Sequence, residues 1–420
     1  MVGRAVLPVT ADMVRAAAEA LAGHVVDTPC AASPALSELT GANVYVKLET
    51  FQRTGSFKDR GARNRLLALT EQERVSGVVA ASAGNHAQGV AYHARSLGVP
   101  ATIVVPERTP FTKIARTREL GASVVVRGAD VAAATAVAIE LAAVDDLVFV
   151  HPYDDPLVIA GQGTVGLEIM AAVPDVDVIV APVGGGGLLG GIAVAVRDAP
   201  TDGGHPSGTG AAVELVGVQA DDFPAMAQRF HGVRGARSPG ASTIADGIAV
   251  TAPGALTGEL VRALVDDVVT VSEARIEESI TYLLELEKTV TEGAGAAPLA
   301  ALLDDPARFA GRTVVLVVSG GNIEPRVLAS VILRGLGRQG RLVRILVDID
   351  DTPGRLAEIA AVIAGAGANV VEVEHGRLTS DIAVQRARVS FVLETVDAAH
   401  AGLVFDALGA AGFPAERREL

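Results

Sequence analysis

Short apolar runs alternate with helical patterns from about residue 10 to residue 335, and this alternation constrains the fold more than any other feature. The runs are continuous rather than mixed with polar residues, as in Val78–Ala81, Ala101–Val105, Val178–Pro182 and Thr313–Val318. Continuous apolar strands separated by helices are typical of a parallel sheet covered by helices on both faces. The sequence therefore predicts an α/β fold for this part of the chain.

A polar, glycine-rich segment at Arg334–Arg341 has no apolar period and is predicted to be a domain boundary. We expect one domain over residues 1–335, with a smaller subdomain nested within it at roughly 50–155. We expect a second domain over residues 336–420. Its pattern is β-α-β-β-α, with room for a short final strand, which is typical of a small ferredoxin-like module.

Composition excludes several classes of function. The formal net charge is −14 and only 3% of residues are aromatic, so the surface repels phosphate backbones and offers few stacking platforms for nucleic acid. The single cysteine, Cys30, cannot form an intrachain disulfide, which suits a reducing compartment. The longest uncharged run, Val178–Val196, is broken by glycines and Pro182, so it reads as strand, loop and helix rather than as a membrane span. We expect a cytoplasmic protein that binds neither membrane nor nucleic acid.

Lysine is rare, since the 35 basic residues include only Lys47, Lys58, Lys113 and Lys288. Arginine serves here wherever a cation alone is needed, so a remaining lysine marks a position that needs an amine. Lys58 follows a glycine turn and an apolar Phe57, in the sequence TGSFK. A partly desolvated lysine has a lowered pKa and can form a Schiff base. Lys58 is therefore a candidate nucleophile, with a solvated surface lysine as the ordinary alternative.

Three further motifs follow predicted strands. Ser82–His86 opens a helix, whose N-terminal N–H groups can bind an anion. In Gly184–Leu188, four consecutive glycines let the backbone approach a phosphate, and the helix that follows adds its positive end. Ser319 ends a third strand, at the edge where open α/β sheets bind ligands. Each motif is also compatible with a purely structural turn.

Rival chemistries have weaker signals. Gly185, Gly187 and Gly190 satisfy the spacing of a dinucleotide-binding loop, but a lone match of this kind is weak, and an NAD enzyme stays a remote alternative. His86 and His93 are one heptad apart and favour helix packing over metal binding. The G-x-S-x-G motif of serine hydrolases is absent.

Taken together and in this order, the motifs resemble those of the fold-type II pyridoxal-phosphate enzymes, and among them the threonine dehydratases (threonine ammonia-lyases). The resemblance covers about residues 10–330. It rests on TGSFK, SAGNHAQG, GGGGL, STIADG at 242–247, TEGAGA at 291–296 and SGGN. It implies a catalytic domain of two α/β subdomains, like the β subunit of tryptophan synthase, and pyridoxal 5′-phosphate as the cofactor.

The resemblance also implies a role for each motif. Lys58 would form the internal aldimine, and Ser319 would hydrogen-bond the pyridine nitrogen. Asn85 would contact the cofactor 3′-oxygen. The cofactor phosphate would be held by Gly184, Gly185, Gly186, Gly187 and Leu188. The substrate carboxylate would be bound by Ser82, Ala83, Gly84, Asn85 and His86.

The implied reaction is deamination of L-threonine to 2-oxobutanoate and ammonia, with L-serine to pyruvate as a second reaction. The freed Lys58 amine would remove the Cα proton as a general base, and the β-hydroxyl would leave after protonation through the cofactor phosphate. A neutral Ser319 would not hold a proton on the pyridine nitrogen as a carboxylate would. Elimination is therefore favoured over transamination.

The C-terminal segment resembles an ACT domain, a small regulatory module that binds amino acids. Thr352 is predicted to cap its first helix, which would begin at Pro353. An effector such as isoleucine or valine would bind near Asp351, Thr352, Pro353, Gly354 and Asn369, in a site that such modules often form at a subunit interface. A domain that only dimerises is the alternative, and we expect a homo-oligomer, either dimer or tetramer.

Departures from the threonine dehydratase pattern define the alternatives. Asp59 after Lys58 completes the pattern SFKDRG, which resembles that of threonine synthase. That enzyme would need O-phosphohomoserine as its substrate. A serine-preferring dehydratase is a second alternative, and a catalytically silent amino-acid sensor is a third. Ala83 stands where similar serine racemases have a second serine, so racemisation is disfavoured. Gln219 and Ala225 stand where those racemases have acidic ligands, so no metal site of that kind is expected.

Overall fold

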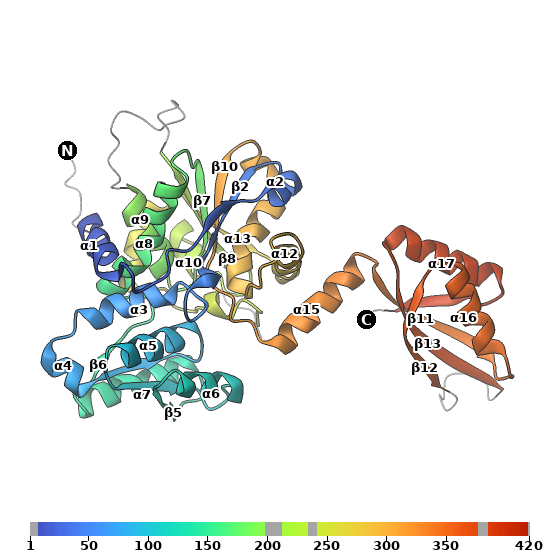
Figure 1. Ribbon diagram of the computed structural model, residues 1–420, viewed down its shortest axis with the longest axis horizontal. Coiled ribbons are helices and arrows are strands. Elements are labelled where there is room, and N and C mark those ends of the chain that lie inside the picture. Colours follow the sequence, from blue (N-terminus) through green and yellow to red (C-terminus); the bar gives the residue numbers. More distant parts are fainter. Residues whose placement is uncertain (1–6, 198–211, 234–241, 377–384, 419–420) are drawn as a thin grey trace. The chain divides into compact units, whose positions relative to one another are not determined.

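The chain forms two compact units, Met1–Ile323 and Glu324–Leu420. The computed structural model describes residues 7–197, 212–233, 242–376 and 385–418 (Figure 1). The division lies before the boundary expected at 335/336, because α15 (Pro325–Arg338) runs through the start of the predicted linker and belongs to the second unit. Its glycines cost about 1 kcal/mol each in helix propensity, and the apolar residues at helical spacing before them outweigh this cost.

The first unit contains a large sheet of six strands in the order β1-β2-β10-β7-β8-β9. Within this described sheet β1 is antiparallel to β2, and all other neighbours are parallel. The strands are β1 (Cys30–Ala32), β2 (Asn43–Leu48), β7 (Val178–Pro182), β8 (Glu214–Ala220), β9 (Asp267–Val271) and β10 (Thr313–Val318). The predicted α/β fold class is thereby confirmed, and the strongest apolar runs form the sheet centre.

Helices cover both faces of the large sheet, and we call this assembly the large lobe. On one face lie α8 (Pro156–Ala172), α9 (Gly187–Arg197), α10 (Ala225–His231) and α11 (Ala255–Leu264). The other face packs against α13 (Gly293–Asp304), which in turn contacts α12 (Glu273–Leu286). The remaining helices of this lobe are α1 (Ala11–Leu21), α2 (Pro34–Thr40) and α14 (Pro306–Phe309), with short 3-10 turns η1 (Glu49–Phe51) and η2 (Asp246–Ile248).

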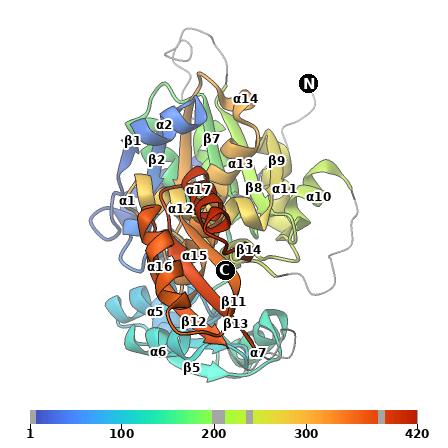
Figure 2. The same cartoon turned by 90° about the vertical axis from the view of Figure 1, so that its right-hand side faces the viewer.

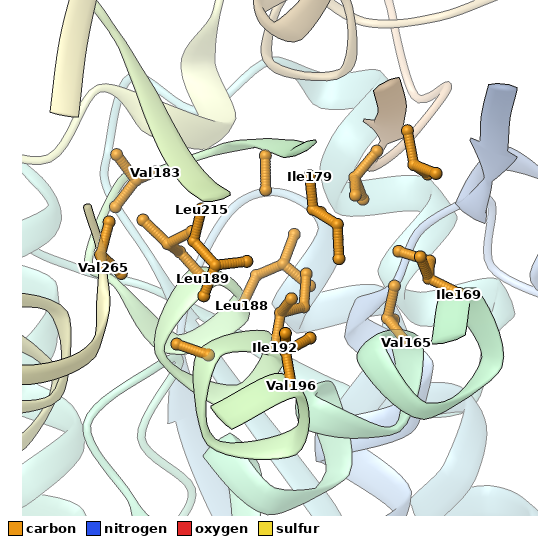
Figure 3. Close-up of a cluster of buried hydrophobic side chains, with 14 of the residues drawn as sticks. Val165, Ile169, Ile179, Val183, Leu188, Leu189, Ile192, Val196, Leu215 and Val265 are labelled. Atoms are coloured by element: carbon orange, nitrogen blue, oxygen red, sulfur yellow. The ribbon is translucent and has the colours of Figure 1, made fainter. Parts of the chain in front are cut away.

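The apolar side of α9 fixes the glycine loop that precedes it. Figure 3 shows Leu188, Leu189 and Ile192 directed toward Ile179 and Leu215 of the sheet. Each such side chain contributes about 1.5–3 kcal/mol when fully buried. The first turn of α9 is therefore held rigidly at the carboxyl end of β7.

A small lobe is inserted between β2 and β7. Its sheet has the order β5-β4-β3-β6, and all neighbours are parallel. Its strands are β3 (Val78–Ala81), β4 (Ala101–Val105), β5 (Ser123–Val126) and β6 (Val148–Phe149). Its helices are α3 (Lys58–Leu67), α4 (Glu71–Ser76), α5 (Asn85–Ser96), α6 (Phe111–Glu119) and α7 (Val131–Val144). Figures 1 and 2 both show these elements gathered apart from β7 and β8 of the large sheet.

The uncharged run at 178–196 forms β7, the glycine loop and most of α9, as the sequence predicted. Gly184, Gly185 and Gly186 lie between the strand and the helix, so the run does not form one long helix. Among the residues that the structure describes, no helix is long and apolar enough to cross a membrane.

The second unit is a four-stranded antiparallel sheet in the order β12-β13-β11-β14, with a β-α-β-β-α-β chain order after α15. Its elements are β11 (Leu342–Asp350), α16 (Arg355–Gly365), β12 (Asn369–Gly376), β13 (Arg386–Glu394), α17 (Ala398–Ala410) and β14 (Ala415–Arg418). The prediction that Thr352 caps a helix beginning at Pro353 is wrong. The Thr352 N–H bonds to the Asp350 carbonyl in a tight turn, and Gly354, with φ of 98°, precedes the helix.

Candidate active site

The TGSFK turn places Lys58 at the first position of α3. Asp59, fully buried, accepts hydrogen bonds from both the N–H and the hydroxyl of Thr54, and it thereby closes the turn. Gly55 adopts φ of 78°, and an added Cβ there would lie 2.9 Å from the Asn322 side chain, so glycine is required. Asp59 therefore has a structural role in this turn, and this role accounts for its presence after Lys58 without a threonine synthase activity.

The same turn is joined to the loop after β10. The Phe57 N–H donates to the Ser319 carbonyl at 3.0 Å, and Ser56 pairs with Gly320 in an isolated β-bridge. Ser319 is buried at the end of β10. The structure therefore brings Lys58 and Ser319, far apart in sequence, to the same edge of the large sheet.

The Lys58 amine lies in an environment that favours its neutral form. Burial lowers the pKa of Lys58 to about 8, although the nearby Glu292 carboxyl opposes this shift. The amine donates a hydrogen bond to the Pro152 carbonyl at 2.7 Å and lies 5.0 Å from the centre of the Phe57 ring. The neutral amine is the form that attacks an aldehyde, and the lowered pKa makes this form far more abundant near pH 7 than it is in an ordinary lysine.

The glycine loop forms a cradle that side chains would fill. A Cβ on Gly185 would lie 2.5 Å from Cδ2 of Tyr153 and closer to other ring atoms. At Gly184 it would lie 3.0 Å from the Gly247 carbonyl, and Gly186 has φ of 96°. The N–H groups of the first helical turn have no partners within the helix, so they can donate to an anion.

The Ser82–His86 loop connects β3 to α5 and is partly exposed up to Asn85. The Ser82 hydroxyl accepts the Gly84 N–H at 3.2 Å, which shapes the turn. The His86 ring bonds to the Val150 carbonyl at 2.9 Å, and burial lowers the pKa of His86 to about 3. His86 is therefore neutral, and the loop can attract a carboxylate through backbone N–H groups rather than through an imidazolium charge.

Asn85 is held by two side chains that the sequence analysis did not single out. Its Nδ2 donates to Glu292 Oε1 at 2.7 Å, and its Oδ1 accepts from Asn322 Nδ2 at 2.7 Å. Asn322 also donates to the Thr54 carbonyl at 2.7 Å. Burial raises the pKa of Glu292 to about 7, while the bond from Asn85 opposes this shift.

Comparison with known proteins decides the family. A family model described as "Pyridoxal-phosphate dependent enzyme" matches residues 21–320. The chain belongs to this family. The match spans both lobes and ends before the second unit, so the lysine, the glycine cradle and Ser319 all lie within the region that defines a pyridoxal-phosphate enzyme.

Individual relatives are similar over most of the chain. An L-threonine ammonia-lyase of Thermotoga maritima is 44% identical over 96% of this chain and 98% of its own length. The catabolic L-threonine dehydratase of Escherichia coli K12 is 43% identical over 76% of this chain and 94% of its own length. The solved structure of a threonine deaminase of T.th. is 38% identical, with a TM-score of 0.68 over 75% of this chain and 99% of that one. Maize serine racemase has a TM-score of 0.71 at 31% identity, over 79% of this chain and 98% of that one.

The residues of this pyridoxal-phosphate enzyme fit its cofactor. The glycine loop is a cradle that any Cβ would obstruct, at the N-terminus of a helix that favours a phosphate. The Tyr153 ring lies against Gly185, and the adjacent Pro152 carbonyl holds the Lys58 amine. One short loop thus contacts both the Lys58 amine and the glycine cradle. This proximity is what a single cofactor with an aldehyde at one end and a phosphate at the other requires.

The residues predicted for an effector are not brought together within one copy of the chain. Asp351–Gly354 follows the end of β11, where Asp350 pairs with Arg386. Asn369 pairs with Glu394, which in turn pairs with Leu342 at the start of β11. A helical crossover returns the chain to the starting end of the sheet, so the two parts lie about 25 Å apart along β11. Within one copy of the chain the two parts of the predicted effector site therefore lie at opposite ends of the sheet, and a site that uses both would need two copies.

The residues that sequence reasoning missed are Glu292, Asn322, Pro152 and Tyr153. Glu292 and Asn322 lie within TEGAGA and SGGN, motifs that carried the resemblance without a role for these side chains. Pro152 and Tyr153 lie in the loop after β6, and no pattern in the sequence marks them. All four act through contacts with segments distant in sequence.

Proposed function

We propose that the chain deaminates L-threonine to 2-oxobutanoate and ammonia, and L-serine to pyruvate as a second reaction. The observation that carries this proposal is a lysine with a lowered pKa beside a glycine cradle, in a pyridoxal-phosphate enzyme that is 44% identical to an L-threonine ammonia-lyase over 96% of the chain. The alternatives of a serine-preferring dehydratase and threonine synthase have no comparable support.

Each residue has a part in this proposal. Pyridoxal phosphate, when bound, supplies an electron sink for the electrons released at the substrate Cα. Lys58 holds the cofactor and, as a neutral amine, takes the Cα proton. The Gly184–Gly187 backbone and Leu188 N–H bind the phosphate, and the Ser82–His86 backbone binds the substrate carboxylate. Loss of the β-hydroxyl as water gives an enamine, whose hydrolysis releases the oxo acid and ammonia.

Two side chains direct the outcome of this reaction. Ser319 offers a neutral hydroxyl to the pyridine nitrogen, which disfavours a long-lived carbanion and therefore favours elimination over transamination. Ala83 has no hydroxyl to protonate the opposite face of the substrate, which supports elimination over racemisation in a fold that is also similar to serine racemase.

The second unit is proposed to be a regulatory ACT module that binds a branched-chain amino acid, in a homo-oligomer. Its ferredoxin-like strand order and the Asp351–Gly354 turn support this role. Because Asn369 lies at the other end of the sheet, the turn is the half of the predicted site to test first. Substitution of Thr352 by Ala should weaken inhibition by isoleucine and leave turnover unchanged; equal inhibition of both proteins would reject the turn as the effector site.

The test is formation of 2-oxobutanoate by purified protein with pyridoxal phosphate and L-threonine, with L-serine, O-phosphohomoserine and isoleucine arms. We expect turnover of threonine above serine and none of O-phosphohomoserine. Turnover of O-phosphohomoserine alone would establish threonine synthase. Cofactor binding without turnover of any of these substrates would reject the proposed reaction.

A further inference from the structure

Glu292 is the N-cap residue of α13, but its side chain does not cap that helix. A short acidic or hydroxyl side chain at an N-cap usually accepts an N–H of its own first turn, as Asp130 does for α7 by accepting from the Ala133 N–H at 2.8 Å. The Glu292 carboxyl instead reaches Asn85 in the small lobe. Its longer side chain serves a residue beyond its own helix.

The carboxyl of Glu292 determines which way the Asn85 amide faces. Above its pKa of about 7 the Glu292 carboxylate can only accept hydrogen bonds, so the group that Asn85 turns toward it must then be the NH₂. The Asn85 oxygen then accepts from Asn322, which is consistent with the same orientation. Glu292 and Asn322 belong to the large lobe and Asn85 to the small lobe, so both ends of one amide are fixed across the boundary between lobes.

Among the residues that the structure describes, this arrangement leaves Asn85 with one unused donor. An NH₂ group has two hydrogens, and one is directed at Glu292 Oε1. A Cβ added to Gly320, next to Ser319, would lie 3.2 Å from the Asn85 Nδ2 and 2.8 Å from Glu292 Oε1. The Asn85 amide and the Glu292 carboxyl therefore both lie against the backbone that follows Ser319.

We propose that Glu292 is a positioning residue, which fixes the Asn85 amide so that its second N–H is presented to the cofactor. The proposal rests on the proposed function and on the cofactor contact that the sequence resemblance gives to Asn85. Glu292 acts through Asn85 and needs no contact with the substrate.

The test measures cofactor affinity by absorbance titration of cofactor-free protein, with no substrate present. Glu292→Ala removes the acceptor and should weaken pyridoxal-phosphate binding about tenfold, which is the worth of a hydrogen bond to a charged group. Glu292→Gln keeps an acceptor oxygen and should bind within about threefold of the natural protein. Equal affinity of Glu292→Ala and the natural protein, or equal loss in both variants, would overturn the positioning role.

The test uses no substrate, so failure of threonine turnover in the natural protein would be a separate result that rejects the proposed function instead.

Discussion

Substitution of Gly185 by alanine tests whether the glycine loop is the phosphate cradle. The new Cβ would lie 2.5 Å from Cδ2 of Tyr153 and closer to two other ring carbons, whereas carbon atoms prefer about 3.5–4 Å. The ring would have to move by more than 1 Å, and its hydroxyl would strain the 3.0 Å bond to the Ala252 carbonyl. Overpacking of this size costs about 1–3 kcal/mol, and loss of the hydrogen bond costs about 1 kcal/mol.

Gly190→Ala, in the helix that follows the loop, is the matched control. Its Cβ would lie 3.5 Å from Cβ of Leu260, which is an ordinary contact, and alanine is favoured over glycine in a helix by about 1 kcal/mol. We therefore expect Gly185→Ala to lower the free energy of unfolding by about 2–4 kcal/mol, and Gly190→Ala to leave it unchanged or raise it slightly.

Urea unfolding of cofactor-free protein and titration with pyridoxal phosphate measure the two effects. A loss of about 2 kcal/mol in cofactor binding corresponds to about 30-fold weaker affinity for Gly185→Ala, while Gly190→Ala should bind normally. If the two variants unfold at the same urea concentration and bind the cofactor equally, the cradle assignment is refuted.

Three further predictions concern Lys58 and its surroundings. Lys58→Arg should abolish threonine turnover while the unfolding midpoint stays near that of the natural protein, because arginine cannot act as an amine nucleophile; retained turnover would refute the assignment. Burial lowers the pKa of Lys58 from 10.5 to about 8, so about one tenth of this amine is neutral at pH 7, against about 0.03% of an ordinary lysine. The rate of Lys58 acylation in cofactor-free protein should therefore rise with pH through about 8 and then level off. A rate that keeps rising to pH 10 would contradict the lowered pKa. Arg60, fully buried, pairs with the fully buried Glu49 at 2.8 Å and with Glu168 at 2.5 Å. Arg60→Met leaves a buried carboxylate without its cation, so it should lower the free energy of unfolding in urea by about 3–5 kcal/mol. A change below about 1 kcal/mol would contradict this expectation.

The sequence predicted strands well where glycine or proline stands at one end of an apolar run. Val78–Ala81, Ala101–Val105 and Val178–Pro182 form β3, β4 and β7 with the same bounds. Helices α8 and α13 were not predicted, because both are rich in alanine, valine and glycine and are buried around most of their circumference, so they show no amphipathic period. Pro298 inside α13 also favours a break over a helix.

The candidate site was predictable where a motif carries its own chemistry. The Lys58 turn and the glycine loop could be found because their local sequence determines both backbone shape and reactivity. The partner of Asn85 could not, since Glu292 is distant in the chain and its N-cap position predicts a different hydrogen bond. Asn369 was assigned to the same effector site as Asp351–Gly354 from motifs alone. The strand register places the two at opposite ends of the sheet within one copy of the chain.

The central claim is that Lys58 holds the cofactor. The measurement is borohydride reduction of the protein loaded with pyridoxal phosphate, followed by digestion and mass mapping of the modified lysine. Because the chain has only four lysines, each possible attachment gives a distinct peptide. The account predicts a phosphopyridoxyl group on Lys58, and attachment to Lys47, Lys113 or Lys288 in its place would contradict it.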